Sequence, residues 1–307
     1  MPDINPIRII RKYGLWGTFV KTLRFAAGFA ANEIENRYYR FKHRKIRQYR
    51  DPESGELHVI EQGFKNQGVD ICDFRIEASD YNEFKSLLPF PADYHGGVDS
   101  GVWEEKIVEH YIAYKMLELR DFRQNDIYVD VAACNSPWAR ILRDTLNIQA
   151  FAIDLALPEE HKKLDYYRVE NATKTSFPDS SVKGVSLHCA FEMFAGDDDV
   201  KLIRELQRIL RQGGKAVIVP LYMHTHYCCF ASPEYWGKGH ADSAALEYVR
   251  LDMRGIPSAR NYDVVALQER ILRTIENCGM HSKIYVLRNG KSLSPEVYCH
   301  FILEITK

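Results

Sequence analysis

Small and acidic residues that close apolar runs in the middle of this 307-residue chain have the chemistry to bind a nucleoside. Asp154 ends one such run, and its carboxylate can accept two hydrogen bonds from a ribose diol, as an acid does in dinucleotide-binding folds. Asn171 and Ala172 follow the next run and could contact an adenine ring and its amino group. An earlier run, which begins at Ile127, ends in small residues that let a backbone come close to a ligand: Ala132, Ala133, Cys134 and Ser136.

Four titratable side chains near the ends of the fourth and fifth predicted strands are candidates for a catalytic base: His188, Glu192, His224 and His226. A histidine or a carboxylate in such a position can take the proton of a hydroxyl nucleophile. A structural role is the alternative for each of the four.

The run from His224 to Cys229, with His240 further on, raises the question of a metal site. Its spacing matches no known ligand pattern, and the adjacent residues Cys228 and Cys229 cannot easily both bind one tetrahedral ion. We therefore expect no metal site.

Strand-like and helix-like segments alternate from residue 127 onward, and these elements must position the candidate residues. The predicted strands are 127–133, 150–154, 166–170, 183–189, 214–221, 282–288 and 297–305, with helices at 137–146, 198–211 and 263–277. The last two strands lack a helical crossover and can pair antiparallel. The pattern predicts an α/β fold, a doubly wound, mostly parallel seven-stranded sheet with an antiparallel edge hairpin. Ligands of such sheets bind beyond the carboxyl ends of the strands.

A further helix is predicted to start near Val102 and to pack on the sheet. Its apolar side carries Trp103, Ile107, Val108, Tyr111 and Tyr114. Its other side carries the charged residues Glu104, Glu105, Lys106 and Glu109.

Segment 103–307 resembles the class I S-adenosylmethionine-dependent methyltransferases, in the type 11-like branch with a Pro-Asp signature before the fourth strand. The matching pieces are VDVAACNS at 129–136, AIDL at 152–155, SFPDSSV at 176–182 and ELQRILRQGG at 205–214. The resemblance implies S-adenosylmethionine as cofactor and S-adenosylhomocysteine as product. It assigns the cofactor contacts to Asp130, Ala132, Ala133, Cys134, Ser136, Asp154, Leu155, Asn171, Ala172, Leu187 and His188.

The chain departs from the family where Gly-x-Gly-x-Gly is usual, because Ala132, Cys134 and Ser136 stand in those places. Positions that need a positive φ tolerate a Cβ poorly. Two hypotheses follow. The chain is a methyltransferase that acts on a small-molecule or saccharide-type acceptor, by O-methylation, or it is a catalytically inactive methyltransferase-like binding or assembly protein.

Residues 223–262 are expected to form an inserted lid over the acceptor. Side chains suited to a polar or sugar-like substrate are Tyr222, Tyr235, Trp236, Arg260 and Tyr262. The alternative is that these aromatic and arginine side chains pack the insertion itself.

Residues 1–50 are strongly basic, with twelve Lys and Arg against three Asp and Glu, in a chain whose net charge is −1. Apolar residues recur at helical spacing from Leu15 to Ala27, which predicts an amphipathic helix. The helix could pack on the protein body or on a second subunit in a homodimer, or lie on an anionic membrane surface through residues 8–50. Nucleic acid is the least favoured partner, because no nucleic-acid module is recognisable.

The expected domain organisation has three parts. Residues 1–50 form a basic helical extension, 51–101 an irregular region with short strands at 58–60 and 69–71, and 102–307 the methyltransferase-like domain. Seven cysteines without regular spacing and the absence of a secretory leader favour a cytoplasmic protein. Peripheral association with the inner face of the membrane is the open alternative.

Overall fold

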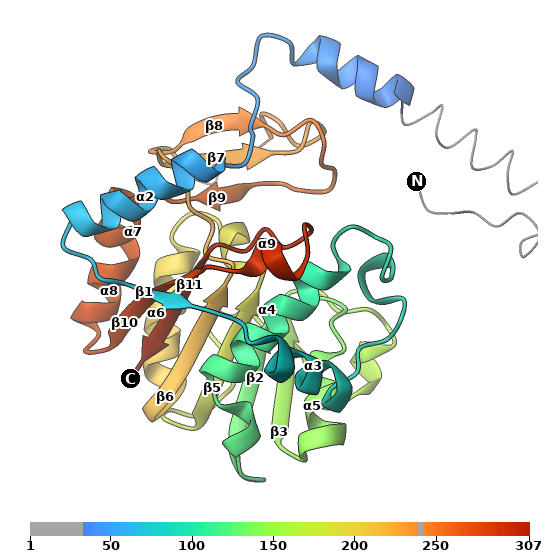
Figure 1. The fold of residues 1–307 in the computed structure, drawn as a ribbon, viewed down its shortest axis with the longest axis vertical. Helices are drawn as coiled ribbons and strands as arrows, with labels where there is room; N and C mark the ends of the chain where they lie inside the picture. The colour runs from blue at the N-terminus through green and yellow to red at the C-terminus, as the bar shows by residue number, and fades with distance from the viewer. Residues whose placement is uncertain (1–32, 239–241) are drawn as a thin grey trace, which may run out of the picture. The chain divides into compact units, whose positions relative to one another are not determined.

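The computed structural model describes residues 33–238 and 242–307 (Figure 1). The predicted amphipathic helix from Leu15 to Ala27, and His240, lie outside the described residues. The described chain divides into two compact units. Unit 1 comprises 33–50, 230–238 and 247–257, and unit 2 comprises 51–229, 242–246 and 258–307.

Unit 2 is built on an eight-stranded sheet in the order β1-β10-β11-β6-β5-β2-β3-β4. Its strands are β1 Ile71–Phe74, β2 Ile127–Val131, β3 Gln149–Asp154, β4 Tyr167–Val169, β5 Val182–His188, β6 Leu210–Val219, β10 His281–Leu287 and β11 Phe301–Thr306. Strand β11 runs antiparallel to both of its neighbours, and the other pairs are parallel. This order confirms the predicted doubly wound, mostly parallel fold.

Helices cover both faces of this sheet, and each face has its own apolar core. One core is packed by α3 Ala78–Leu87, α4 Trp103–Met116 and α5 Trp138–Leu146, which lie on the same side of the sheet in Figure 1. The other is packed by α2 Ser54–Asn66, α6 Asp198–Ile209, α7 Val264–Leu267 and α8 Arg273–Asn277. Neighbouring strand residues alternate between the two cores, as Tyr128 and Val129 do, because successive side chains of a strand point to opposite faces.

The remaining elements of unit 2 are short. They are the helix α9 Gly290–Leu293, the π-helical turn Gln268–Leu272 between α7 and α8, and the 3-10 turns Tyr94–Gly96, Leu119–Asp121, His161–Lys163 and Phe191–Met193. The interval between β6 and α7 carries β7 Cys228–Ala231, β8 Leu246–Val249 and β9 Ala259–Asn261. In unit 1, residues 33–42 are helical. No helix in the described ranges is long and apolar enough to cross a membrane.

Two predictions about the sheet need correction. The sheet has eight strands rather than seven, because β1 pairs with β10 in parallel register, Ile71 opposite Ile284. The β10–β11 hairpin is antiparallel as predicted, but it is not at the edge, since β1 covers β10.

The strand predicted at 58–60 is also wrong, because these residues lie in α2. Leu57, Ile60 and Phe64 recur at spacings of three and four residues and turn toward one core. The β-branched residues at 59 and 60 favour a strand, but the helical spacing of the apolar residues decides the structure here.

The charged side of α4 is buried rather than exposed. Glu105, Lys106 and Glu109 are all less than a tenth exposed. Glu105 accepts hydrogen bonds from the backbone N–H groups of Tyr298 at 2.8 Å and Cys299 at 3.1 Å. Lys106 Nζ lies 2.7 Å from Glu109 Oε1. These partners offset the cost of burying charge, a compensation that helical periodicity cannot predict.

Candidate functional site

A cavity of about 400 Å³ opens at the carboxyl ends of the central parallel strands. This volume lies within the range of roughly 300–1,000 Å³ that is usual for small-molecule sites. Its walls come from the segments that follow β2, β3, β4 and β5: Ala132, Ile153, Asp154, Leu155, Glu170, Asn171, Ala172, Thr173, Cys189, Ala190, Met193, Phe194, Ala195 and Asp198. The cavity therefore lies where a doubly wound sheet binds its ligand.

The loop after β2 keeps a glycine-like backbone without glycine. Ala132 has φ 56° and Cys134 has φ 48°, both in the left-handed region. The carboxylate of Asp154 accepts hydrogen bonds from the N–H of Cys134 at 2.7 Å and of Ala156 at 3.3 Å. Asp154 thus holds the loop and the end of β3 together.

Five of the predicted cofactor-binding residues line the cavity: Ala132, Asp154, Leu155, Asn171 and Ala172. The side-chain oxygen of Asn171 already accepts two hydrogen bonds from Thr173, from N–H at 2.9 Å and from the hydroxyl at 2.8 Å. An adenine amino group would have to share this oxygen.

The other predicted cofactor residues lie outside the cavity lining. The N–H of Cys134 donates to Asp154, and Ser136 Oγ accepts a hydrogen bond from the N–H of Trp138 at 3.2 Å. Leu187 is fully buried and Ala133 nearly so. These residues are not among those that line the cavity.

His188, expected at the acceptor, is instead packed against other polar groups. Its Nδ1 lies 3.1 Å from Oδ1 of the buried Asp130, and its ring centroid lies 4.1 Å from that of His110. Burial, and then His188 itself, hold the pKa of His110 well below its usual range. His188 is not among the residues that line the cavity.

Sequence reasoning missed the segment immediately after β5. Cys189, Ala190, Met193 and Phe194 all line the cavity. Strand β5 ends at His188, and Cys189 turns away from it with φ 50°. The signal was present in the sequence, because Cys189-Ala190 repeats the small-residue ending that follows β2, but the predicted strand extended one residue too far.

Cys189 leads from the cavity into a group of polar side chains, which we call the polar cluster: Lys106, Glu109, Cys189, Glu192, Tyr222 and Tyr298. The Sγ of Cys189 lies 3.1 Å from Tyr222 Oη and 3.6 Å from Glu192 Oε1. Lys106 Nζ donates to Glu109 at 2.7 Å and to Tyr298 Oη at 3.0 Å. Two of the predicted residues, Glu192 and Tyr222, therefore meet here.

Burial shifts the acidity of this cluster. It raises the pKa of Glu192 to about 7, against the opposing effect of Lys106. Burial and the neighbouring Glu192 raise the pKa of the Cys189 thiol to about 12. Among the described residues, Glu192 Oε2 has no hydrogen-bond partner. Glu192 is therefore a carboxyl group that changes protonation near neutral pH while Cys189 stays a thiol.

Two of the expected substrate-binding residues lie in a buried ion-pair group instead. Arg260 is fully buried and pairs with Asp199, and Tyr262 Oη donates to Asp199 Oδ2 at 2.5 Å. Arg270 donates to both oxygens of Asp199, each at 2.7 Å. Neither Arg260 nor Tyr262 is among the residues that line the cavity.

The remaining candidates lie elsewhere. Tyr235 and Trp236 belong to unit 1, where Lys238 lies over the Tyr235 ring and Trp236 meets His43 edge-on. His224 and His226 follow β6 in unit 2, and neither is among the residues that line the cavity.

Residues 129–218 match a family model described as a methyltransferase domain. No curated protein matches the chain. Solved structures that it resembles include 1,6-didemethyltoxoflavin-N1-methyltransferase from Burkholderia thailandensis, with bound S-adenosylhomocysteine, at 13% identity over 78% of this chain and 93% of that chain, TM-score 0.44. Another is geranyl diphosphate C-methyltransferase from Streptomyces coelicolor, at 13% identity over 83% and 99% of the two chains, TM-score 0.41.

The matched domain spans β2 to β6 and so includes β2 to β5, at whose ends the cavity lies. The match identifies a methyltransferase domain at residues 129–218, and the strand order and the acid after β3 agree with the resemblance to the class I S-adenosylmethionine-dependent methyltransferases. That resemblance implies S-adenosylmethionine as the cofactor. The cavity fits that group, since it offers a carboxylate at Asp154 and small residues at Ala132 and Ala172.

Glycine at the left-handed positions of the loop after β2 should stabilise the protein. A left-handed residue with a Cβ costs roughly 1–2 kcal/mol, and the extra freedom of an unfolded glycine costs roughly 0.5–1 kcal/mol. Ala132→Gly and Cys134→Gly should therefore each raise the free energy of unfolding by up to about 1 kcal/mol, measured by urea denaturation. Ala133→Gly is the matched control and should lower it, because Ala133 is buried and not left-handed. The reverse ranking would show that the loop is not strained.

Asp154→Asn should weaken binding of S-adenosylhomocysteine about 10- to 100-fold, since a hydrogen bond to a charged group contributes roughly 1.5–3 kcal/mol. Titration calorimetry measures the affinity. Asp165→Asn, at an exposed carboxylate outside the cavity lining, is the control and should bind like wild type. Equal affinities for all three proteins would remove Asp154 from the cofactor site.

Proposed function

We propose that this methyltransferase O-methylates a hydroxyl group of a small-molecule, saccharide-type acceptor, with Glu192 as the base. The observation that carries the proposal is a carboxyl group with a pKa of about 7 within contact distance of Cys189, which lines the cavity. A general base works best when its pKa lies near the pH at which the enzyme operates.

Different residues around the cavity contribute to ligand binding and to proton transfer. Asp154 lines it from the end of β3, Asn171 and Ala172 from the segment after β4, and Cys189, Ala190 and Met193 from the segment after β5. The cofactor, when bound, supplies an electrophilic methyl group on its sulfonium. Glu192 takes the proton of the acceptor hydroxyl as the oxygen gains the methyl group, so the acceptor ends as a neutral ether.

Charged and polar groups surround Glu192 from several elements. Lys106 of α4 lowers its pKa, while burial raises it more strongly. Cys189, in the segment after β5, donates its S–H toward Glu192, and Tyr222, after β6, contacts the same sulfur. Glu109 is neutralised by Lys106 at 2.7 Å. Glu192 is thus the carboxyl group of the polar cluster that has no salt-bridge partner among the described residues.

The saccharide class is supported by the aromatic wall of the polar cluster. The rings of Tyr222 and Tyr298 are stacked, with centroids 6.5 Å apart at 28°. Tyr298 is 41% exposed, and Lys106 Nζ donates to its hydroxyl. Flat rings beside hydroxyl and ammonium groups suit a polyol with an apolar face and polar edges.

The left-handed loop favours the enzyme over a catalytically inactive binding protein. Ala132 and Cys134 keep the backbone that glycine would adopt, and Asp154 is hydrogen-bonded to that loop. Loss of the cofactor site would leave no reason to retain a strained conformation.

The test is methyl transfer from labelled S-adenosylmethionine to a panel of sugars, phenols, amines and thiols, with the product bond identified by mass spectrometry and NMR. An ether product is expected, and its rate should rise with pH and level off above about 7, because Glu192 must be deprotonated to act. Glu192→Gln should lower kcat about 100- to 10,000-fold and abolish this pH limb.

Glu170→Gln is the matched control for that variant. Glu170 also lines the cavity, but its carboxylate accepts hydrogen bonds from Ser176. Its pH profile should match wild type. An N- or S-methyl product, or an unchanged pH limb in Glu192→Gln, would overturn the proposed chemistry.

We also propose that the basic segment of unit 1 associates with an anionic membrane surface. In the helix at 33–42, Ile34, Tyr38 and Phe41 are 69%, 55% and 67% exposed. Their spacing of four and three residues places them on one helix face. Arg44 lies over the Phe41 ring and Lys42 over the Tyr38 ring, so cations flank the apolar stripe. This is the composition of an interfacial helix.

Full-length protein should co-sediment with vesicles that contain phosphatidylserine, less so at high salt, because surface charge is screened. Phe41→Ser should reduce the bound fraction. Val59→Ser, at a residue of α2 that is 60% exposed, is the control and should not. Equal binding of the two variants, or dimerisation that only Phe41→Ser abolishes, would assign this face to a different role.

A further inference from the structure

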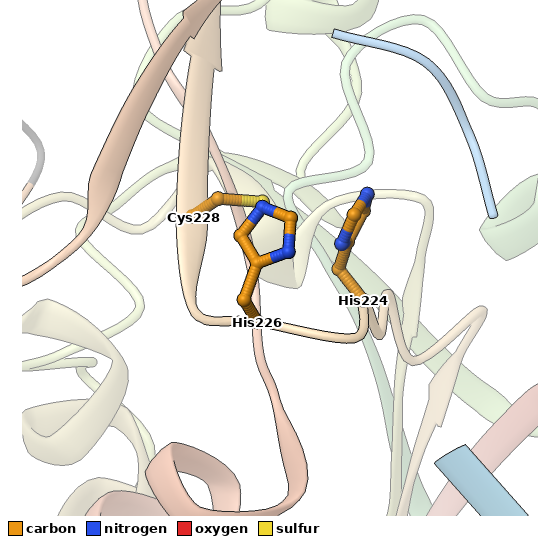
Figure 2. Close-up of side chains that lie close together, drawn as sticks. All are labelled: His224, His226 and Cys228. Carbon is orange, nitrogen blue, oxygen red and sulfur yellow. The ribbon is translucent and has the colours of Figure 1, made fainter. Parts of the chain in front are cut away.

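We infer that His224, His226 and Cys228 form a binding site for a zinc-type divalent cation. One possible ligand atom from each of the three side chains lies within 4.8 Å of the other two. Figure 2 shows the two imidazole rings and the thiol turned toward one another at the entry to β7. A small inward movement of the half-buried His226 ring toward the buried His224 and Cys228 would bring these atoms to zinc-ligand distances of about 2.0–2.3 Å.

A bend in the chain explains why the three side chains meet. The backbone bends at Thr225 and His226 before β7 begins at Cys228, and this bend brings the His224 and His226 ring centroids to 4.2 Å. Cys228 joins the group and the adjacent Cys229 does not. The objection that neighbouring cysteines cannot both bind one ion therefore does not apply to this arrangement.

The backbone that carries the three residues is held in place from one neighbouring segment. The N–H of His224 donates to the carbonyl of Tyr262 at 2.7 Å. The N–H of Tyr227 donates to Asp263 at 3.1 Å, and the same carboxylate caps α7 through the N–H of Ala266 at 2.7 Å. Ligands on a fixed backbone lose little freedom when an ion binds, which favours affinity.

Thr225 supplies the outer contacts that a ligating histidine usually has. Its hydroxyl lies 3.3 Å from Nδ1 of His224 and 3.2 Å from Nδ1 of His226. Hydrogen bonds to the other ring nitrogen orient an imidazole for metal binding.

The donor set selects the kind of ion. Two imidazole nitrogens and one thiolate suit Zn²⁺, whereas Mg²⁺ and Ca²⁺ require oxygen ligands. Within residues 33–238 and 242–307, the group has three members, so a fourth position remains for water or another ligand. On binding, Cys228 releases its thiol proton to solvent, and the thiolate bonds the ion.

The site is separate from the methyl-transfer cavity, since none of its three residues is among those that line it. Along the chain it lies close to the polar cluster, because His224 comes two residues after Tyr222. An ion here would fix the segment that leaves β6, and the inference stands independently of the proposed acceptor.

The test is titration of the full-length, metal-stripped protein with Co²⁺ and Zn²⁺. We expect one ion per chain, with a thiolate-to-cobalt charge-transfer band and the strong visible bands of four-coordinate cobalt, which Zn²⁺ abolishes. Zn²⁺ should also raise the melting temperature, because an ion that binds only the folded state stabilises it.

Matched variants separate the site from chance metal binding. His226→Ala, at a half-buried ring, and Cys228→Ser should lose the Zn²⁺ shift and weaken Co²⁺ binding by more than the roughly 10- to 100-fold that an outer-shell partner is worth. Cys229→Ser changes the same atom one residue away and should retain both signals. Thr225→Val should bind the ion more weakly, with an unchanged charge-transfer band.

Three results would overturn the inference: no binding of either ion, a cobalt spectrum without a thiolate band, or equal losses in Cys228→Ser and Cys229→Ser. Circular dichroism of each variant excludes unfolding as the cause of lost binding. His226→Ala keeps the test decisive if Cys228→Ser fails to fold.

Discussion

One buried carboxylate, Asp199, holds together several segments of unit 2. It lies in the first turn of α6 and binds Arg260, Tyr262 and Arg270, which come from β9, the segment after it and the π-helical turn. Removing one partner of a buried ion pair typically costs about 3–5 kcal/mol, because the other charge is left unpaired. Since Tyr262 also hydrogen-bonds the chain at 222 and 224, the backbone that carries the three proposed metal ligands takes its position from this carboxylate.

The central fold follows from local patterns, whereas its periphery does not. The strands β2 to β6 and the antiparallel pairing of β10 with β11 can be predicted from apolar runs and the missing crossover. Strand β1 cannot, because four residues far upstream join the sheet only through register with β10. The burial of the charged side of α4 could not be predicted for a different reason. Glu105 and Lys106 are buried with partners that are distant in sequence. Periodicity records which side chains are polar, not which have found a partner.

In the candidate site, too, some residues follow from local sequence patterns and others depend on contacts between distant segments. Asp154, Asn171 and Ala172 could be predicted because they directly follow strands, and the sheet topology alone brings them together. Arg260 and Tyr262 are residue types that suit a polar substrate. In the fold, however, Arg260 forms an ion pair with Asp199, and the hydroxyl of Tyr262 donates a hydrogen bond to it. The polar cluster could not be predicted, because Lys106, Glu192 and Tyr298 are far apart in the sequence and each resembles an ordinary surface residue there. Only their tertiary contacts distinguish them.

The place of β11 in the sheet has a consequence for biosynthesis. It pairs with β6 on one side and β10 on the other, although it leaves the ribosome after both of them. Until residues 301–306 emerge, β6 presents an open edge, and β10 with β1 has no attachment to the rest of the sheet. Open strand edges are templates for aggregation, and domains form as the chain is made from its N-terminus. Until β11 is made, the sheet therefore consists of two half-sheets, each with an exposed edge.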